Sequence, residues 1–225
     1  MRKMNKLVNA VNNQVINTLD RLQSLGYVYY YNPPDIYEDK KKSLLLCNNH
    51  QSMKETSEKY FLRPEQYCAL ISTNDYWALL KDYSIIRGSF EFEKNKLIKE
   101  SLLWWPCPVL PDRSMVEELG LDESVKLLFN DKNTISRIRM RTPMRVDFDV
   151  NNDSEMHPRA HMHMQSVETR INTCEPICFN RFMEYILLNY YSEWKIKFDK
   201  REFISFTYEK KKRIIEYNRS VKLCF

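Results

Sequence analysis

Three of the four histidines in this 225-residue chain lie within seven residues of one another, at His157, His161 and His163. A charged segment precedes them and contains Arg145 and Asp147. An aspartate beside a histidine fixes the tautomer of the ring and raises its basicity, which suits proton transfer or metal ligation. Arginine supplies planar donors for a phosphate or for charge that develops on one. These residue types indicate chemistry on a phosphodiester or at a metal ion.

Two predicted strands position these side chains, at residues 137–149 and 160–164. In the first strand most even positions are apolar and most odd positions are charged, as expected when successive side chains point to opposite faces. In the second strand the two histidines alternate with alanine and methionine. Turn residues at 151–154 connect the strands. We therefore expect a hairpin that gathers the acidic and imidazole groups on one uncovered face.

The centre that this hairpin predicts has five members. His161 and His163 are the proton carriers, and Asp147 orients one of them. Arg145, together with Arg139 or Arg141, stabilises the charge that develops on a phosphate. His157, held extended by the proline that follows it, adds a third donor.

Other interpretations of the same face stay open. A divalent metal held by His161, His163 and Asp149 is one of them, and the cofactor is otherwise undetermined. The spacing of the two histidines to Glu168 is similar to half of a cupin motif, but the flanking glycines and the later histidine of that motif are absent. The face is also explained without any function, as the solvated side of a sheet stabilised by Arg–Asp pairs.

Basic residues predict contacts with nucleic acid. A row on alternate positions of the first strand consists of Arg137, Arg139 and Arg141. Such positions lie about 6.6–6.8 Å apart, which is near the phosphate spacing of a single strand. A second cluster consists of Lys210, Lys211, Lys212 and Arg213. The formal net charge of +5 is compatible with nucleic acid without requiring it.

Composition excludes several classes of protein. The chain has only three glycines, whereas phosphate-binding loops and dinucleotide fingerprints need several within one turn. No apolar run is long enough to span a membrane. The polar N-terminal segment does not resemble a signal peptide, so we expect a cytoplasmic protein whose six cysteines stay reduced.

The remaining patterns predict an α+β fold with a mainly antiparallel sheet of about four to six strands. An amphipathic helix is expected at residues 4–25, ending at Gly26, and a long helix at 180–194, after the histidine strand. Further expected elements are helices at 73–81, 112–121 and 122–130, a hairpin at 83–104 and a strand at 203–208. The expected organisation is an N-terminal helix and linker (1–42), a core (43–195), and a C-terminal strand with a basic tail (196–225).

Several strings of the chain resemble known families. RMRTPMRVDFD, followed by HPRAHMHM and FNRFMEYILLNYY, resembles a family of uncharacterised bacterial proteins known only as a domain of unknown function. The upstream strings IIRGSF and WPCP extend this resemblance, which covers residues 67–194. More loosely, the order of an R-x-D strand, an H-x-H strand and a helix is similar to small toxins of bacterial toxin–antitoxin pairs. That resemblance implies matching positions at Arg145, Asp147, His157, His161 and His163.

Three functions follow as hypotheses. The first is an enzyme of the nuclease or phosphodiesterase type that acts on nucleic acid as a toxin or in phage defence, with a protein partner encoded nearby. The second is a non-catalytic subunit of such a complex, since the chain has 14 Tyr, 11 Phe and 4 Trp, and aromatic residues are enriched at binding hot spots. The third is binding of nucleic acid without chemistry. None of them involves a membrane.

Overall fold

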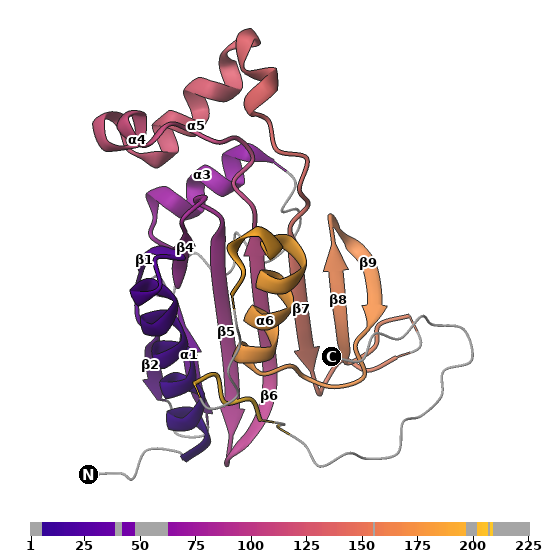
Figure 1. Ribbon diagram of the computed structural model, residues 1–225. Coiled ribbons are helices and arrows are strands. Elements are labelled where there is room, and N and C mark those ends of the chain that lie inside the picture. The colour runs from indigo at the N-terminus through magenta and orange to yellow at the C-terminus, as the bar shows by residue number, and fades with distance from the viewer. Residues whose placement is uncertain are drawn as a thin grey trace.

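The computed structural model describes residues 6–38, 42–47, 63–154, 156–196, 202–206 and 208. In this part of the chain nine strands form one antiparallel sheet, with helices against one face and at one end (Figure 1). The helices are α1 (Lys6–Ser24), α3 (Pro64–Ser72), α4 (Arg113–Leu119), α5 (Leu121–Asn130) and α6 (Phe179–Tyr190), with 3-10 turns η1 (Lys132–Arg137) and η2 (Ser192–Trp194). None of these described helices combines the length and the apolar composition needed to cross a bilayer.

The sheet has the strand order β1-β4-β5-β6-β7-β8-β9, while β3 also pairs with β5 and β2 pairs with β3. The strands are β1 (Val28–Tyr31), β2 (Asp35–Glu38), β3 (Lys42–Leu46), β4 (Ala78–Leu80), β5 (Ile85–Glu93), β6 (Lys96–Trp105), β7 (Met144–Asp149), β8 (Ala160–Met164) and β9 (Ser166–Asn172). The predicted α+β class and mainly antiparallel sheet are confirmed, but the sheet is larger than four to six strands. Strands as short as β2 and β4 show no alternating pattern in a sequence.

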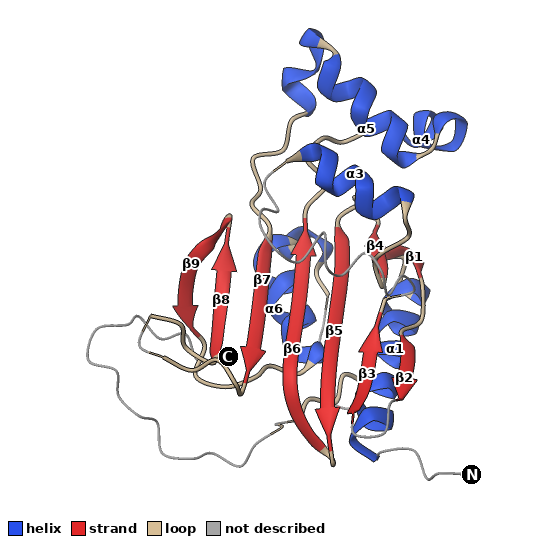
Figure 2. Ribbon diagram, turned by 180° about the vertical axis from the view of Figure 1, so that it is seen from behind, coloured by secondary structure: helices blue, strands red, loops and turns tan. Residues whose placement is uncertain are grey.

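The apolar stripe of α1 packs against the sheet together with α6. Its buried apolar residues are Val8, Val11, Val15, Leu19 and Leu22, which share one hydrophobic cluster with the strands and α6. The helix ends as predicted at Gly26, whose φ of 75° is a conformation that glycine adopts without strain. Both helices lie in front of the sheet in Figure 1, and Figure 2 shows the strands from their other side.

The expected boundary at residue 42 does not coincide with a break in the sheet. The segment predicted as a linker contains β1 and β2, and β3 pairs with both β2 and β5. Leu45 of β3 belongs to the same hydrophobic cluster as α1 and the central strands. The first elements of the chain are therefore built into the main sheet.

Two predicted elements differ from the structure because of local backbone chemistry. The helix expected at 73–81 is wrong, because residues 78–80 of that segment form β4. The helix of this region is α3, which starts at Pro64, a residue suited to the first turn, and ends before Asn74, whose φ is 53°. The strand expected at 137–149 begins only at Met144. Pro143 lacks the N–H that a ladder requires, η1 ends at Arg137, and residues 139–143 are in neither a helix nor a strand.

The C-terminal strand expected at 203–208 is also wrong, since residues 203–206 and 208 are not in a strand. Instead, the carbonyl of Ile204 accepts hydrogen bonds from the side chains of Gln14, at 2.6 Å, and Asn180, at 2.8 Å. These contacts hold the segment across α1 and α6. The hairpin of β5 and β6 and the helix pair α4 and α5, separated by Gly120, are confirmed.

A close approach between Trp77 and Gly88 fixes the centre of the apolar face. A Cβ atom at residue 88 would overlap the indole ring of Trp77. This ring stacks on Phe90, with the centroids 5.9 Å apart, and its Nε1–H donates to the carbonyl of Leu46 at 3.2 Å. Only glycine therefore allows the ring to lie flat across β5.

We expect Gly88→Ala to lower the free energy of unfolding by about 1–3 kcal/mol, because the added methyl group overpacks a filled site. Urea denaturation measures the loss. The matched control is Ser89→Ala, one residue along the same strand, which should change stability far less. In a Trp77→Phe background the smaller ring leaves room, so an unchanged effect of Gly88→Ala there would contradict the explanation.

Glu100 is an exception on the apolar face of the sheet. It is 3% exposed, and both of its carboxyl oxygens are buried without a hydrogen-bond partner of standard geometry among the described residues. Burial raises the pKa of Glu100 well above its ordinary value, and the Cys178 thiol and the Asp147 carboxylate add to the effect. The nearby N–H of Ile177 opposes this shift without outweighing it.

We expect Glu100→Gln to remove a pH dependence of stability. Above about pH 4.3 the unfolded chain loses this proton while the folded protein keeps it, so the stability of the natural protein falls as pH rises. The contribution is about 1.4 kcal/mol for each pH unit over which only the unfolded chain is ionised. Urea denaturation at pH 4 and pH 7 should show that the free energy of unfolding of the variant rises relative to that of the natural protein between the two pH values. If the variant and the natural protein differed in stability by the same amount at both pH values, the result would contradict this expectation.

Candidate functional site

The hairpin of β7 and β8 brings the predicted acidic, basic and imidazole side chains onto one face of the sheet. Asp147 lies directly opposite His161, and Arg145 lies opposite His163. The residues between them are apolar and belong to the cluster under α1 and α6. Alternation therefore turns the polar residues to the other face, which is in front in Figure 2. The predicted hairpin and its shared face are confirmed, and the register is one in which the two polar faces coincide.

A polar row crosses the sheet at the level of this hairpin. Its directly opposed members, from β5 to β9, are Ser89, Ser101, Asp147, His161 and Asn172. Directly opposed side chains on antiparallel strands have Cβ atoms about 4.5–5.5 Å apart, which is within reach of hydrogen bonding. Asp147 and His161 thus have polar neighbours on both sides.

The carboxylate of Asp147 is held from three directions. Its Oδ2 lies 2.8 Å from Nε and 2.7 Å from Nη2 of Arg145, and 3.1 Å from Nε2 of His163. Its Oδ1 accepts a hydrogen bond from the Ser101 hydroxyl at 2.7 Å. Burial alone would raise the pKa of Asp147, but Arg145, His163 and Ser101 together hold it well below its ordinary value. Asp147 is therefore ionised at neutral pH.

The two imidazoles meet at their Nε2 atoms, which are 2.9 Å apart. Nδ1 of His161 lies 2.6 Å from the carbonyl of Pro158, and a carbonyl can only accept, so Nδ1 carries the proton and Nε2 presents a lone pair. The Nε2–H of a neutral His163 then lies between His161 and Asp147. Burial lowers the pKa of His161 to about 4, and it outweighs the opposing effect of Asp147. His161 is therefore neutral at pH 7.

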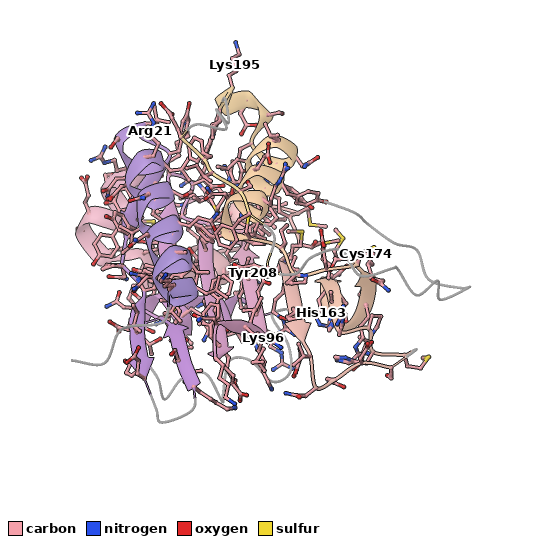
Figure 3. All side chains as sticks on the ribbon, turned by 90° about the horizontal axis from the view of Figure 1, so that it is seen from below. Arg21, Lys96, His163, Cys174, Lys195 and Tyr208 are labelled. Atoms are coloured by element: carbon pink, nitrogen blue, oxygen red, sulfur yellow. The ribbon has the colours of Figure 1, made fainter. Side chains whose placement is uncertain are left out.

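Both rings are buried, which corrects the expectation of an uncovered face. His161 is 1% and His163 is 2% exposed, whereas the side chains of Arg145 and Asp147 are 15% and 20% exposed. Figure 3 shows His163 near the β8 side of the sheet, away from α1. His157 is half-buried at the rim, and its ring centroid lies 4.5 Å from that of His161. The accessible groups of the centre are thus Arg145, Asp147 and His157.

Asp149 does not belong to this centre, which corrects the predicted metal ligands. It lies two residues farther along β7, where its Oδ2 pairs with Nζ of Lys99 at 3.0 Å. The potential ligand atoms of Asp147, His161 and His163 instead lie within 4.8 Å of one another. In the part of the chain that the structure describes, this is the one group of three or more His, Cys, Asp or Glu residues that could hold a metal ion.

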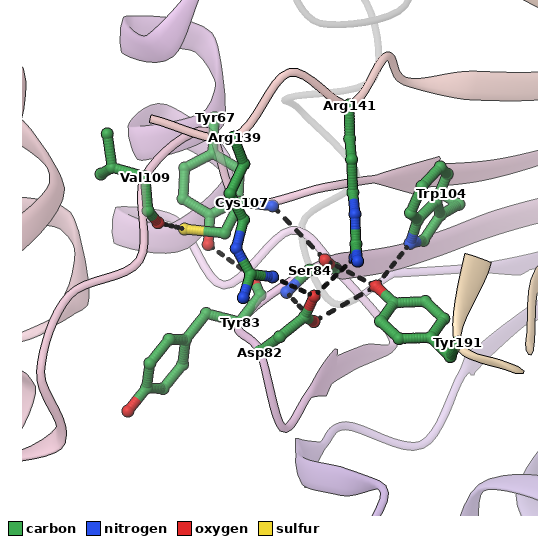
Figure 4. Close-up of polar contacts among 10 residues, drawn as sticks. All are labelled: Tyr67, Asp82, Tyr83, Ser84, Trp104, Cys107, Val109, Arg139, Arg141 and Tyr191. Atoms are coloured by element: carbon green, nitrogen blue, oxygen red, sulfur yellow. Dashed lines mark hydrogen bonds and ion pairs between the residues drawn. The ribbon is translucent and has the colours of Figure 1, made fainter. Parts of the chain in front are cut away.

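The predicted arginine row is wrong, because its members are not on a strand. Arg137 belongs to η1 and pairs with Asp112 at 2.6 Å. Arg139 and Arg141 both reach Oδ2 of Asp82, at 2.9 and 3.2 Å (Figure 4). Each of the three is thus ion-paired within the chain, and the spacing argument for a nucleic-acid backbone no longer applies. The cluster at residues 210–213 lies outside the described residues.

Asp82 is the hub of a network that the sequence analysis missed. Its Oδ1 accepts from the backbone N–H of Ser84 at 3.1 Å and lies 3.2 Å from the hydroxyl of Tyr191. This hydroxyl also lies 2.8 Å from Oγ of Ser84 and accepts from Nε1 of Trp104 at 3.2 Å. Burial raises the pKa of Tyr191, so the phenol stays protonated. Figure 4 shows how the network ties the segment that leads into β7 to the end of α6.

No local signal could have identified this network. Asp82 is 57 residues from Arg139 and 109 residues from Tyr191. Ser101 and the carbonyl of Pro158, which orient Asp147 and His161, were also missed. Ser101 could have been found only from the pairing register of β6 with β7.

Residues 27–225 match DUF2290, described as an uncharacterised conserved protein. The chain belongs to this family. The match confirms the resemblance to a domain of unknown function and extends beyond residues 67–194, over which the sequence strings suggested it. No curated protein and no solved structure matches the chain.

We expect Asp82→Ala to lower the free energy of unfolding by about 2–3 kcal/mol. The substitution leaves two neighbouring guanidinium groups without their shared carboxylate, and this loss is smaller than that of a fully buried pair because water reaches both arginines. Thermal or urea denaturation measures it. The matched control is Asp112→Ala, whose exposed pair with Arg137 should contribute about 0–1 kcal/mol. Equal effects of the two variants would contradict a structural role of the Asp82 network.

Proposed function

We propose that the protein cleaves phosphodiester bonds in nucleic acid, with Asp147, His161 and His163 as its reacting centre. The observation that carries the proposal is the continuous contact from Asp147 through His163 to His161, with separations of 3.1 and 2.9 Å. Coupled carboxylate and imidazole groups of this kind activate water or hold the ion that does so. The loose resemblance to toxins supports a toxin–antitoxin or phage-defence setting for this activity.

The roles of the surrounding residues follow from their contacts. Arg145 acts through Asp147, because two of its nitrogen atoms are within 2.8 Å of that carboxylate. It is therefore a positioning residue and not a group that contacts the phosphate. Ser101 positions the second carboxylate oxygen. His157, at the rim, is the imidazole best placed to exchange a proton with a leaving group.

A second candidate function, that of a non-catalytic subunit, is favoured by a different observation. Apolar side chains are exposed along α5 and the segment that follows it. They are Leu127 at 48%, Phe129 at 39%, Ile135 at 77%, Ile138 at 43% and Met140 at 95% exposure. Exposed apolar side chains that lie close together often mark protein interfaces. These exposed side chains support the hypothesis that a partner protein, encoded nearby, binds this region.

We expect the purified protein to cleave single-stranded RNA or DNA, and His163→Gln and Asp147→Asn to slow cleavage by about 100-fold or more. End-labelled oligonucleotides, tested with and without added divalent metal, measure the rate. The matched control is Asp149→Asn, which lies on the same strand and face but outside the centre, and should cleave at the natural rate. Melting temperatures of all variants separate a catalytic effect from unfolding.

Two results would count against the proposal. Equal loss of activity in Asp149→Asn would show that the centre has no special role. Unchanged toxicity or defence in folded His163→Gln, together with loss in Phe129→Ser, would favour the non-catalytic subunit instead.

A further inference from the structure

We propose that Asp147, His161 and His163 bind a divalent transition-metal ion of the class that prefers imidazole ligands, such as Zn²⁺, Fe²⁺ or Co²⁺. Two histidines and one carboxylate are a recurrent ligand set for such ions. The catalytic use of the ion rests on the proposed function, whereas its binding does not.

Two of the three separations between the ligand atoms, from His163 to His161 and from His163 to Asp147, fit one ion. Metal bonds to histidine and aspartate are about 2.0–2.2 Å long, so ligand atoms 2.9–3.1 Å apart subtend an angle of about 90° at the metal. This is the angle between neighbouring octahedral positions. Opening the group by a few tenths of an ångström gives the wider angle of a tetrahedral site. Three protein ligands leave further positions for water or substrate.

The orientation of His161 also fits metal ligation. Its Nδ1–H is directed at the carbonyl of Pro158, which is the usual arrangement behind a ligating histidine. This bond leaves the Nε2 lone pair aimed at His163. Without a cation, one proton on His163 must serve both His161 and Asp147. A metal ion takes the place of that proton and accepts all three ligands.

The contacts of the carboxylate predict which ions bind. Arg145 already balances the charge of Asp147, and it shares Oδ2 with any ion that binds there. The attraction for a hard cation such as Mg²⁺ or Ca²⁺, which needs several oxygen ligands, is therefore weak. Two imidazole nitrogens favour transition metals. The site should discriminate strongly against Mg²⁺.

A missing hydrogen bond limits the affinity for the metal ion. When His163 ligates through Nε2, its proton moves to Nδ1, and this atom is buried without a hydrogen-bond partner among the described residues. Missing partners of ligating histidines weaken metal sites by about 10- to 100-fold. We therefore expect weaker binding than in a zinc site whose outer contacts are complete.

The experiment is a metal titration of the full chain after removal of metal with a chelator. Calorimetry with Zn²⁺ and visible absorption with Co²⁺ should show one ion per chain. Mg²⁺ at the same concentrations should give no signal. His161→Ala, His163→Ala and Asp147→Asn should each weaken binding by tenfold or more, and Asp149→Asn should bind as the natural protein does. Zn²⁺ should raise the melting temperature only of proteins that bind it.

The possible outcomes separate this inference from the proposed function. Absence of Zn²⁺ and Co²⁺ binding by the folded natural protein, or equal loss in Asp149→Asn, would overturn the metal site. Binding without cleavage of nucleic acid would leave the metal site standing and remove the proposed function. Cleavage by metal-free protein that does not bind Zn²⁺ would leave the proposed function standing and remove the metal site.

Discussion

The register between β7 and β8 is the constraint on which the candidate centre depends. Side chains alternate between the two faces of a strand, so a shift of β8 against β7 by one residue would turn either Asp147 or the two imidazoles into the apolar cluster. The antiparallel pairing of Asp147 with His161 prevents this. The apolar residues between them lock the register, because they fill the space beneath α1 and α6.

This arrangement gives the sheet two different faces. One face is apolar and covered by two helices, and it contains the Trp77–Gly88 contact and the buried carboxyl group of Glu100. The other face carries a polar row that extends from Ser89 to Asn172. A charged or polar side chain on that second face can find a partner on the adjacent strand, as Asp147 finds Ser101. The carboxyl oxygens of Glu100 have no partner of standard geometry among the described residues, and burial therefore favours the neutral form of this side chain.

Ion pairing divides the arginines near β7 into two groups with different consequences. Arg139 and Arg141 converge on Asp82, which secures the chain as it approaches the strand. Arg145 instead pairs with Asp147 inside the hairpin. The first group stabilises the fold, and the second sets the charge of the centre. A basic sequence pattern alone does not distinguish these roles, since all three arginines stand at odd positions of one predicted strand.

Much of the local structure could be predicted from the chain itself. The α1 stripe with its glycine stop, the β5–β6 hairpin and the pairing of the histidine strand depend on periodicity and turn residues, which are local properties. The four-residue edge strand β2 could not be predicted, because short segments acquire strand structure from their neighbours.

The chemistry of the centre was only half determined by the sequence. Alternation in two nearby segments was enough to place Asp147 and the two histidines on one face. Only the tertiary structure decided that Asp147 and not Asp149 joins them, that the rings are buried, and that Arg139 and Arg141 are bound to Asp82. These outcomes depend on residues far away in the chain, such as Lys99 and Asp82, and distances of that kind are set by folding and not by spacing along the sequence.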